Sequence, residues 1–269
     1  MRNTRFVWRP SRLLALALAG LLAVAVLAAI ARWERRDERS AAAAAADPSP
    51  VFVPLISQTS RPVAPGLPLD PYAARGGEAT YYAADGGGNC GFPATPGNLL
   101  VGAMNHADYA GSLTCGVYAE VAGPKGTIVV RITDQCPECQ PGDIDLSAEA
   151  FALIAEPAQG RVPITWRIVS PALAGPIVYH FKDGSSQWWT AVQIRNHRNG
   201  IWRLEYLAPG GAWKSIPRVD YNYFVEPSGM GLGPYTFRVT DYYGNTLIDS
   251  GIALAPDGDV AGKAQFPRQ

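Results

Sequence analysis

The chain has few of the residues on which several enzyme classes depend. It holds three histidines in 269 residues, and no serine or cysteine stands in a nucleophile motif. A glycine-rich phosphate loop is also absent. The histidines are scattered without ligand spacing, and we interpret them as surface or packing residues: His106, His180 and His197. We therefore expect no metal, no cofactor and no serine- or cysteine-based catalysis.

Positive charge is scarce beyond the first 46 residues. Residues 1–46 hold eight arginines and three acidic residues, whereas the full chain has 23 basic and 23 acidic residues. The remainder therefore has an acidic excess, and residues 75–172 hold only five basic residues against ten acidic ones. Recognition of nucleic acid needs a basic face, so we expect no nucleic-acid partner. Uncharged polysaccharide remains open.

The amino-terminal segment predicts export. Four arginines precede an uncharged, almost wholly apolar run over 13–31, which ends in the small-x-small sequence Ala29-Ile30-Ala31. A run of about 19 residues is long for a signal peptide and could just span a bilayer. Residues 1–46 are therefore a cleaved signal peptide, which we favour, or an uncleaved anchor. In both cases we expect a secreted, extracellular protein, with membrane contact only through an uncleaved anchor. We also expect a monomer.

A proline-rich stretch precedes the folded part. Residues 47–74 hold seven prolines without sustained periodicity, which is typical of an extended spacer. The roughly 195 residues that follow are enough for two domains of about 100 residues each. We predict domains over 75–172 and 173–269, divided in the proline-containing segment 170–176.

All four cysteines lie in the first predicted domain: Cys90, Cys115, Cys136 and Cys139. An even count in an exported protein implies disulfides, with three connectivities open. We favour Cys136–Cys139 with Cys90–Cys115. A zinc site is the alternative, although such sites usually show a second closely spaced pair.

Short strands separated by turn residues dominate both domains. In the first, strands are predicted over 77–82, 99–105, 116–121, 127–132 and 164–169, with one helix that Ser147 caps. This pattern predicts a small closed barrel. In the second, strands are predicted over 177–181, 189–195, 202–206, 236–240 and 245–254. These strands favour an all-β sandwich. That domain also has four tryptophans, seven tyrosines and no cysteine, a composition that suits a binding module.

Four carboxylates between 133 and 147 are the candidates for chemistry. Glycoside hydrolysis generally needs two, a protonated acid and an ionised partner. Asp145 is the acid candidate because its neighbours are apolar, and Asp134 is the second member because it ends a predicted strand. Glu138 and Asp143 are interpreted as solvated turn residues. The alternative is structural: Asp134 caps a turn, and Asp145 helps to cap the following helix.

Strand alternation separates the two adjacent tryptophans of the second domain. Trp189 would share a polar, solvent-facing side with Gln193, whereas Trp188 would point to the core with Val192. Exposure of both would require a bulge or a loop conformation at this point. Trp202, with its alternating neighbours, is interpreted as core. Thr80 is interpreted as structural, because a lone threonine in a strand usually is. Tyr221 could be either a core or a binding residue.

At these positions the chain resembles a bacterial expansin. The resemblance covers about 75–269 and follows motifs that occur in family order: 77–82, Val121-Ala122-Gly123-Pro124-Lys125-Gly126, Thr133-Asp134, Asp145-Leu146-Ser147, Ile164-Thr165-Trp166-Arg167, 182–189 and Asp220-Tyr221-Asn222. It implies a mainly β architecture. A six-stranded double-psi β-barrel, similar to family 45 endoglucanases, would be followed by an immunoglobulin-like β-sandwich that binds cellulose.

The resemblance also implies roles for particular residues. Thr80, Asp134 and Asp145 would line the barrel groove. The flat aromatic row would comprise Trp188, Trp189 and Tyr221, with Lys182 nearby, which overrides the alternation argument and predicts a bulge. Two departures stand out: Cys136 replaces a tyrosine of some bacterial members, and Asp143-Ile144-Asp145 replaces the H-F-D of plant members.

The function that the resemblance implies is non-enzymatic. Expansins bind cellulose and related wall polysaccharides and loosen plant cell walls by disrupting non-covalent glucan contacts, and they lack the base of the endoglucanases. The alternative is a glycan-cleaving enzyme that uses Asp145, either an endoglucanase or a peptidoglycan lytic transglycosylase.

Overall fold

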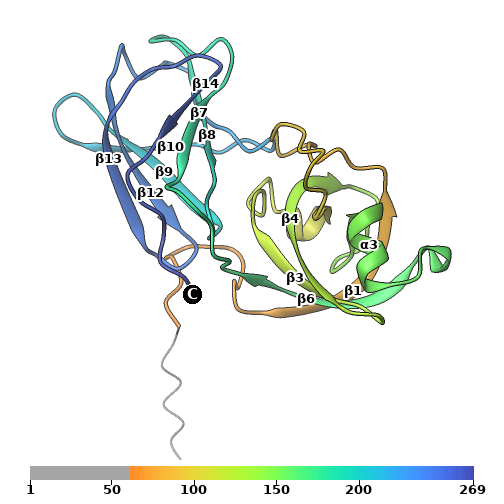
Figure 1. The fold of residues 1–269 in the computed structure, drawn as a ribbon. Helices are drawn as coiled ribbons and strands as arrows, with labels where there is room; N and C mark the ends of the chain where they lie inside the picture. The colour runs from red at the N-terminus through yellow and green to blue at the C-terminus, as the bar shows by residue number, and fades with distance from the viewer. Residues whose placement is uncertain (1–60) are drawn as a thin grey trace, which may run out of the picture. The chain divides into compact units, whose positions relative to one another are not determined.

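The computed structural model describes residues 61–269, and a closed six-stranded barrel forms the first part of them (Figure 1). Its strands are β1 (Ala74–Tyr82), β2 (Val101–Asn105), β3 (Tyr118–Ala122), β4 (Thr127–Cys136), β5 (Ile144–Ser147) and β6 (Val162–Val169). The order β1-β5-β2-β4-β3-β6 combines two parallel pairs with four antiparallel ones and leaves no unpaired edge. The predicted barrel is confirmed.

The helix in the barrel begins as predicted. Ser147 caps α3 (Ala148–Ile154), and its side-chain oxygen accepts a hydrogen bond from the backbone N–H of Ala150 at 3.0 Å. Phe151 and Ile154 are fully buried on the inner face of this helix. The short helices α2 (His106–Tyr109) and η1 (Pro157–Gln159) have no counterpart in the prediction.

Two strand predictions around the carboxylate loop were wrong. β5 lies inside the segment that was interpreted as a loop, because four residues between a Pro-Gly turn and a helix are too few to show a period. β4 continues to Cys136, so that Asp134 lies within the strand and does not end it. Ile144 and Leu146 are fully buried, while Asp145 between them points the other way.

Two four-stranded sheets form the predicted β-sandwich. One has the order β10-β9-β12-β13 and the other β11-β8-β7-β14. The strands are β7 (Val178–Phe181), β8 (Thr190–Arg195), β9 (Ile201–Leu207), β10 (Trp213–Ile216), β11 (Phe224–Glu226), β12 (Tyr235–Asp241), β13 (Thr246–Ile252) and β14 (Gly258–Ala261). Tyr179 of one sheet stacks on Phe237 of the other at 5.1 Å between ring centroids. β10, β11 and β14 have no counterpart in the prediction.

The residues before β1 pack against both parts. The backbone N–H of Ala64 donates to the carbonyl of Tyr242 at 2.8 Å, and Ala64 is buried. The ring of Tyr72 lies 5.3 Å from that of Tyr243. The predicted signal segment and the first part of the predicted spacer lie outside the described residues. Within residues 61–269, no helix is long and apolar enough to cross a membrane.

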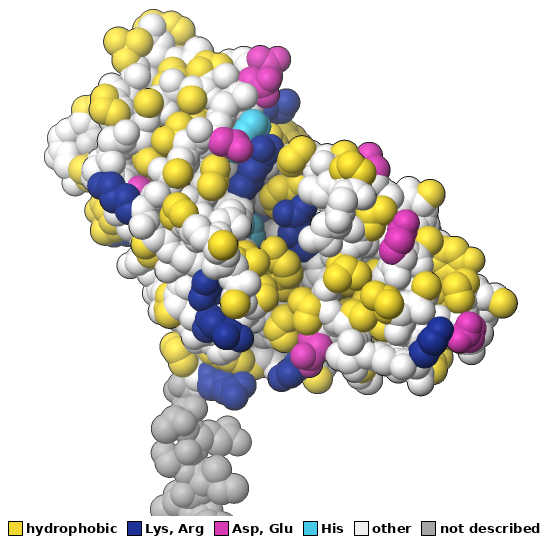
Figure 2. All heavy atoms as spheres, viewed as in Figure 1, with side chains coloured by type: hydrophobic (Ala, Val, Ile, Leu, Met, Phe, Trp, Pro, Cys, Tyr) yellow, Lys and Arg dark blue, Asp and Glu magenta, His cyan; other side chains and the backbone are white. Residues whose placement is uncertain are grey.

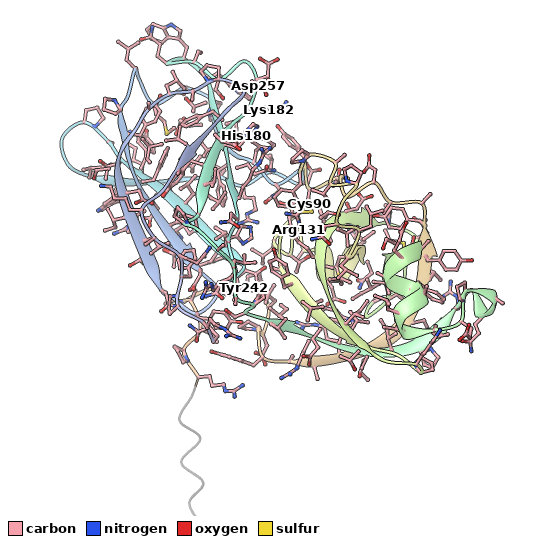
Figure 3. The ribbon with its side chains drawn as sticks, viewed as in Figure 1. Cys90, Arg131, His180, Lys182, Tyr242 and Asp257 are labelled. Atoms are coloured by element: carbon pink, nitrogen blue, oxygen red, sulfur yellow. A yellow bond between two sulfur atoms is a disulfide. The ribbon has the colours of Figure 1, made fainter. Side chains whose placement is uncertain are left out.

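The barrel and the sandwich belong to one compact unit and share a polar seam. The hydroxyl of buried Tyr242 donates to the carbonyl of Leu113 across it. Arg218 donates to the carbonyl of Ser112 at 2.9 Å, and burial lowers the pKa of its guanidinium to about 10. Figure 2 shows basic side chains and a histidine gathered in this region, and Figure 3 places Arg131 there.

Candidate functional site

The barrel register brings three predicted groove residues into one row. Thr80 on β1 pairs with Asp145 on β5, Asp145 pairs with Ala103 on β2, and Ala103 pairs with Asp134 on β4. These are four consecutive strands of the barrel. Because neighbouring strands lie about 4.8 Å apart, the backbones of Asp145 and Asp134 are separated by roughly 10 Å. The small side chain of Ala103 lies between them.

Asp145 is held by the neighbouring strand. The Thr80 hydroxyl donates to Oδ1 of Asp145 at 2.5 Å. Burial raises the pKa of the Asp145 carboxyl, the Thr80 hydrogen bond opposes that rise, and the nearby Glu138 adds to it. The raised pKa was expected, and its largest cause is burial of the carboxyl.

Asp134 is fixed by backbone donors. Its Oδ1 accepts hydrogen bonds from the backbone N–H groups of Asn89 at 2.7 Å and of Gln135 at 2.8 Å. The loop that supplies Asn89 approaches closely, since a Cβ on Gly88 would lie 2.3 Å from Cγ of Asp134. Gly88 also has a φ of +138°, which favours glycine. Only glycine at this position allows the loop to cover the carboxylate.

Tyr82 lies near the two carboxylates of the row, and the sequence reasoning missed it. Its hydroxyl is buried and has no hydrogen-bond partner among the described residues. Burial raises the pKa of this phenol, and the charges of Asp134 and Asp145 raise it further, so the hydroxyl lies near both carboxylates. The signal was available: Thr80 and Tyr82 are two residues apart in a strand and therefore share a face.

The two remaining carboxylates of the loop differ from each other. Glu138 is exposed, as expected for a turn residue. The prediction that Asp143 is solvated was wrong: it is 6 % exposed and accepts hydrogen bonds from the backbone N–H groups of Glu78 at 2.8 Å and of Gln140 at 3.1 Å. Asp143 therefore anchors the turn before β5 to β1.

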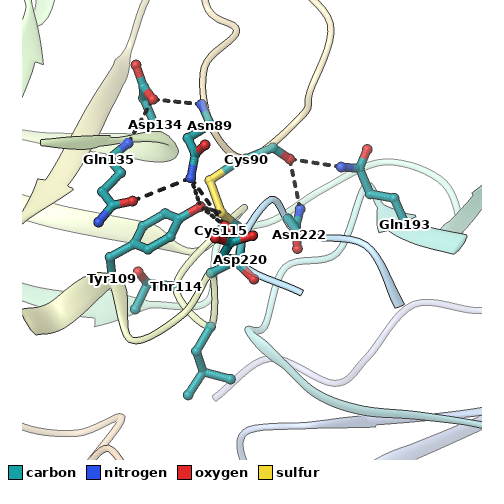
Figure 4. The surroundings of a disulfide bond; sticks show 12 residues. Asn89, Cys90, Tyr109, Thr114, Cys115, Asp134, Gln135, Gln193, Asp220 and Asn222 are labelled. Atoms are coloured by element: carbon teal, nitrogen blue, oxygen red, sulfur yellow. Dashed lines mark hydrogen bonds between the residues drawn. A yellow bond between two sulfur atoms is a disulfide. The ribbon is translucent and has the colours of Figure 1, made fainter. Parts of the chain in front are cut away.

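Both favoured disulfides are present. Cys90 pairs with Cys115 and Cys136 with Cys139, and the Cα atoms are 5.4 Å apart in each pair. Figure 4 shows the first bridge at the seam between barrel and sandwich. No three His, Cys, Asp or Glu side chains within residues 61–269 are grouped so that they could hold a metal ion.

The aromatic residues of the predicted row lie outside the strands of the sandwich. Gln187 and Trp188 form a turn that is closed by a bridge between Ser186 and Trp189, and β8 starts only at Thr190. Trp188 is 73 % exposed, whereas Trp189 is partly buried. The alternation argument was therefore wrong, because it extended the strand over both tryptophans. The turn exposes Trp188 without the predicted bulge, since β7 and β8 pair in continuous register.

The side of β8 that was predicted to face solvent is buried. Gln193 is fully buried, and its Nε2 donates to the carbonyl of Cys90 in the barrel at 2.9 Å.

Tyr221 is 37 % exposed, and its ring lies 5.8 Å from that of Tyr223. The Lys182 ammonium lies over the Tyr223 ring at 5.8 Å. Trp202, predicted as sandwich core, is only partly buried and packs against the barrel core.

A protein family and several individual proteins resemble this chain. A family model described as a lytic transglycolase matches residues 74–166, which is the barrel. The expansin YoaJ of Bacillus subtilis is 38% identical over 181 residues, which are 64% of this chain and 77% of that protein. The chain belongs to the expansins.

Solved expansins share the fold at similar identity. The crystal structure of a point mutant of the Clavibacter michiganensis expansin in complex with cellohexaose is 36% identical, with a TM-score of 0.69. The match covers 73% of this expansin and all of that chain. The ligand-free Clavibacter michiganensis expansin gives the same TM-score at 35% identity. The likeness spans barrel and sandwich together.

Proposed function

We propose that this expansin binds cellulose and related wall polysaccharides and loosens the wall by separating glucan chains without cutting them. The observation that carries the proposal is the row of Thr80, Asp145 and Asp134 across four paired strands. Carboxylates and hydroxyls in such a row can bind the hydroxyls of an extended sugar chain. The related Clavibacter expansin crystallised with cellohexaose, a short glucan, supports this ligand class.

The two carboxylates of the row are not closely coupled. A tightly coupled acid–base pair would make each carboxylate a main influence on the pKa of the other. Asp134 is instead the smallest of the named influences on Asp145, after burial, Thr80, Glu138 and Arg161. In addition, Oδ1 of Asp134 already accepts two backbone hydrogen bonds. Asp145 and Asp134 therefore lack the close spacing of a retaining glycosidase pair, and a sugar-release assay tests the wider spacing of an inverting pair.

The sandwich supplies the anchoring surface. Trp188, Trp189 and Tyr221 would stack on sugar rings, with Lys182 at the edge of this set. An exposed tryptophan on a turn offers a large apolar face at little cost to the fold. Loosening follows if the groove prefers a separated chain to a packed one, since an equilibrium between states shifts only by differential affinity.

An extracellular site of action is part of the proposal. The predicted export segment supports it, as do the two disulfides, which persist in oxidising compartments.

One pair of assays on the intact protein tests the function. Wall strips held under constant load should extend when the protein is added, while no soluble sugar is released. The barrel's match to the lytic transglycolase model favours a second candidate, glycan cleavage with Asp145 as acid. Release of reducing sugars or of peptidoglycan fragments that disappears in Asp145→Asn would support cleavage and overturn the proposal. Cellulose binding without extension would reduce the function to binding alone.

A further inference from the structure

We propose that Asn89 is a positioning residue that ties the groove carboxylate Asp134 to the turn that carries Tyr221. The inference rests on the proposed function, because it concerns how the groove and the aromatic surface are held in one arrangement. Asn89 lies in the loop between β1 and β2, far in sequence from either partner. Figure 4 shows it between the barrel and the sandwich.

The barrel side of the link uses backbone atoms. The N–H of Asn89 donates to Oδ1 of Asp134 at 2.7 Å, and the N–H of the next residue, Cys90, donates to the carbonyl of Thr133 at 3.1 Å. Two consecutive loop residues are thus pinned to two consecutive residues of β4. The close approach of Gly88 to Asp134 leaves the loop no room to shift toward the strand.

The sandwich side of the link begins with the Asn89 side chain. Its Nδ2 donates to the Tyr109 hydroxyl at 2.9 Å and lies 3.2 Å from the carbonyl of Asp220. The Tyr109 hydroxyl in turn donates to the same Asp220 carbonyl at 2.7 Å. Asp220 immediately precedes Tyr221, so this carbonyl fixes the entry of the chain into the aromatic turn.

The residue after Tyr221 is held by the same loop. Nδ2 of buried Asn222 donates to the carbonyl of Cys90 at 3.2 Å, beside the Gln193 amide at 2.9 Å. Asn222 has a φ of +64°, which places it in the left-handed region of a tight turn. Asn89 and Cys90 therefore bind both neighbours of Tyr221 while they also bind β4.

The Cys90–Cys115 disulfide makes this loop a firm base. Both cysteines are almost completely buried, and Cys115 follows α2 in the barrel. Asn89 itself is exposed, so its side chain contributes little to the core. Asn89→Ala would remove the side-chain bonds to Tyr109, to Asp220 and, at 3.4 Å, to Gln135, yet keep the backbone N–H that binds Asp134. The substitution therefore removes the side-chain links of Asn89 and leaves the backbone bond to Asp134 in place.

The test measures hydrogen exchange and wall extension in the full chain. Asn89→Ala should speed exchange across residues 219–224 by about threefold or more, with exchange of the core strands unchanged and Tm shifted by about 2 °C or less. It should slow wall extension about threefold, since it removes roughly one net hydrogen bond. Asn98→Ala is the matched control, because Asn98 is an exposed loop asparagine that binds only its local backbone.

A double-mutant cycle with Tyr221→Ala separates positioning from general stabilisation. If Asn89 acts through Tyr221, Asn89→Ala adds no further loss of extension in the Tyr221→Ala background. Additive losses, or unchanged exchange at 219–224, would overturn the inference, as would wild-type extension in Asn89→Ala. Failure of the unmodified protein to extend walls would instead refute the proposed function, and the exchange measurement would still decide the link.

Discussion

On the barrel, Thr80, Asp145 and Asp134 lie on paired strands and are partly buried, whereas on the sandwich Trp188 and Tyr221 lie on turns and are exposed. Register fixes the barrel residues, and an irregularity in the β2–β4 pairing between Gly102 and Ala103 brings Asp134 opposite Ala103. The sandwich residues owe their exposure to turns that leave the sheet. Polar contacts need fixed partners because their strength depends on distance and angle. Stacking on a flat surface needs exposed area above all.

The largest expected effect is loss of stability in acid, which would remove the barrel row and the aromatic surface together. His197 is buried at the seam, and burial, reinforced by Arg218 and Arg131, lowers its pKa from 6.5 to about 4. The folded protein thus holds this histidine neutral, and stability is present above pH 6.5 and lost as the pH falls toward 4. The full loss is roughly 3 kcal/mol. Urea unfolding between pH 7 and pH 4 measures it.

His197→Gln should flatten this acid dependence, because glutamine does not titrate. His106→Gln is the control, since His106 is exposed in the barrel. Equal slopes in the two variants would contradict the assignment to His197.

The next effect separates the groove from the aromatic surface. Asp145→Ala should slow wall extension about ten- to hundredfold, the equivalent of one or two hydrogen bonds to a charged group. Cellulose binding in a pull-down assay should stay within about twofold, because distant sites act independently. Glu138→Ala, which removes an exposed carboxylate of the same loop, should change neither. Normal extension by Asp145→Ala would refute the role of the groove.

A substitution in the sandwich tests the aromatic surface separately from the barrel row. Trp188→Ala should weaken binding to cellulose about tenfold, a loss of roughly 1.4 kcal/mol. Tm should not change, because Trp188 is 73 % exposed. Leu232→Ala is the matched control, since Leu232 is 75 % exposed on another loop of the sandwich. Equal binding by the two variants would remove Trp188 from the binding surface.

The smallest effect tests the hydrogen bond inside the row. Thr80→Val should slow extension about three- to tenfold, because one intramolecular hydrogen bond contributes about 1 kcal/mol. Thr80→Ser keeps the hydroxyl that donates to Asp145 and should stay near wild type. Extension rates that do not distinguish valine from serine would show that Thr80 only fills space.

Much of the architecture could be predicted from local patterns. The alternation over 164–169, the Ser147 cap and the even cysteine count led to a barrel strand, a helix and two disulfides that the structure contains. These signals are local, since side-chain periodicity and capping involve residues within one turn or one strand. β5 has four residues and β11 has three. Both were missed because so few residues do not show a recognisable alternation.

The sequence by itself determined which residues could be functional. It named Thr80, Asp134 and Asp145, and it named the aromatic residues of the sandwich. Only the tertiary structure decided how they are arranged. Trp188 is exposed by a turn that periodicity mistook for a strand, and Asp143 is buried by contacts with a strand 65 residues away. Thr80, Asp145 and Asp134 form a row because β5 and β2 insert between β1 and β4. Strand order depends on closure of the barrel as a whole, and no local pattern encodes it.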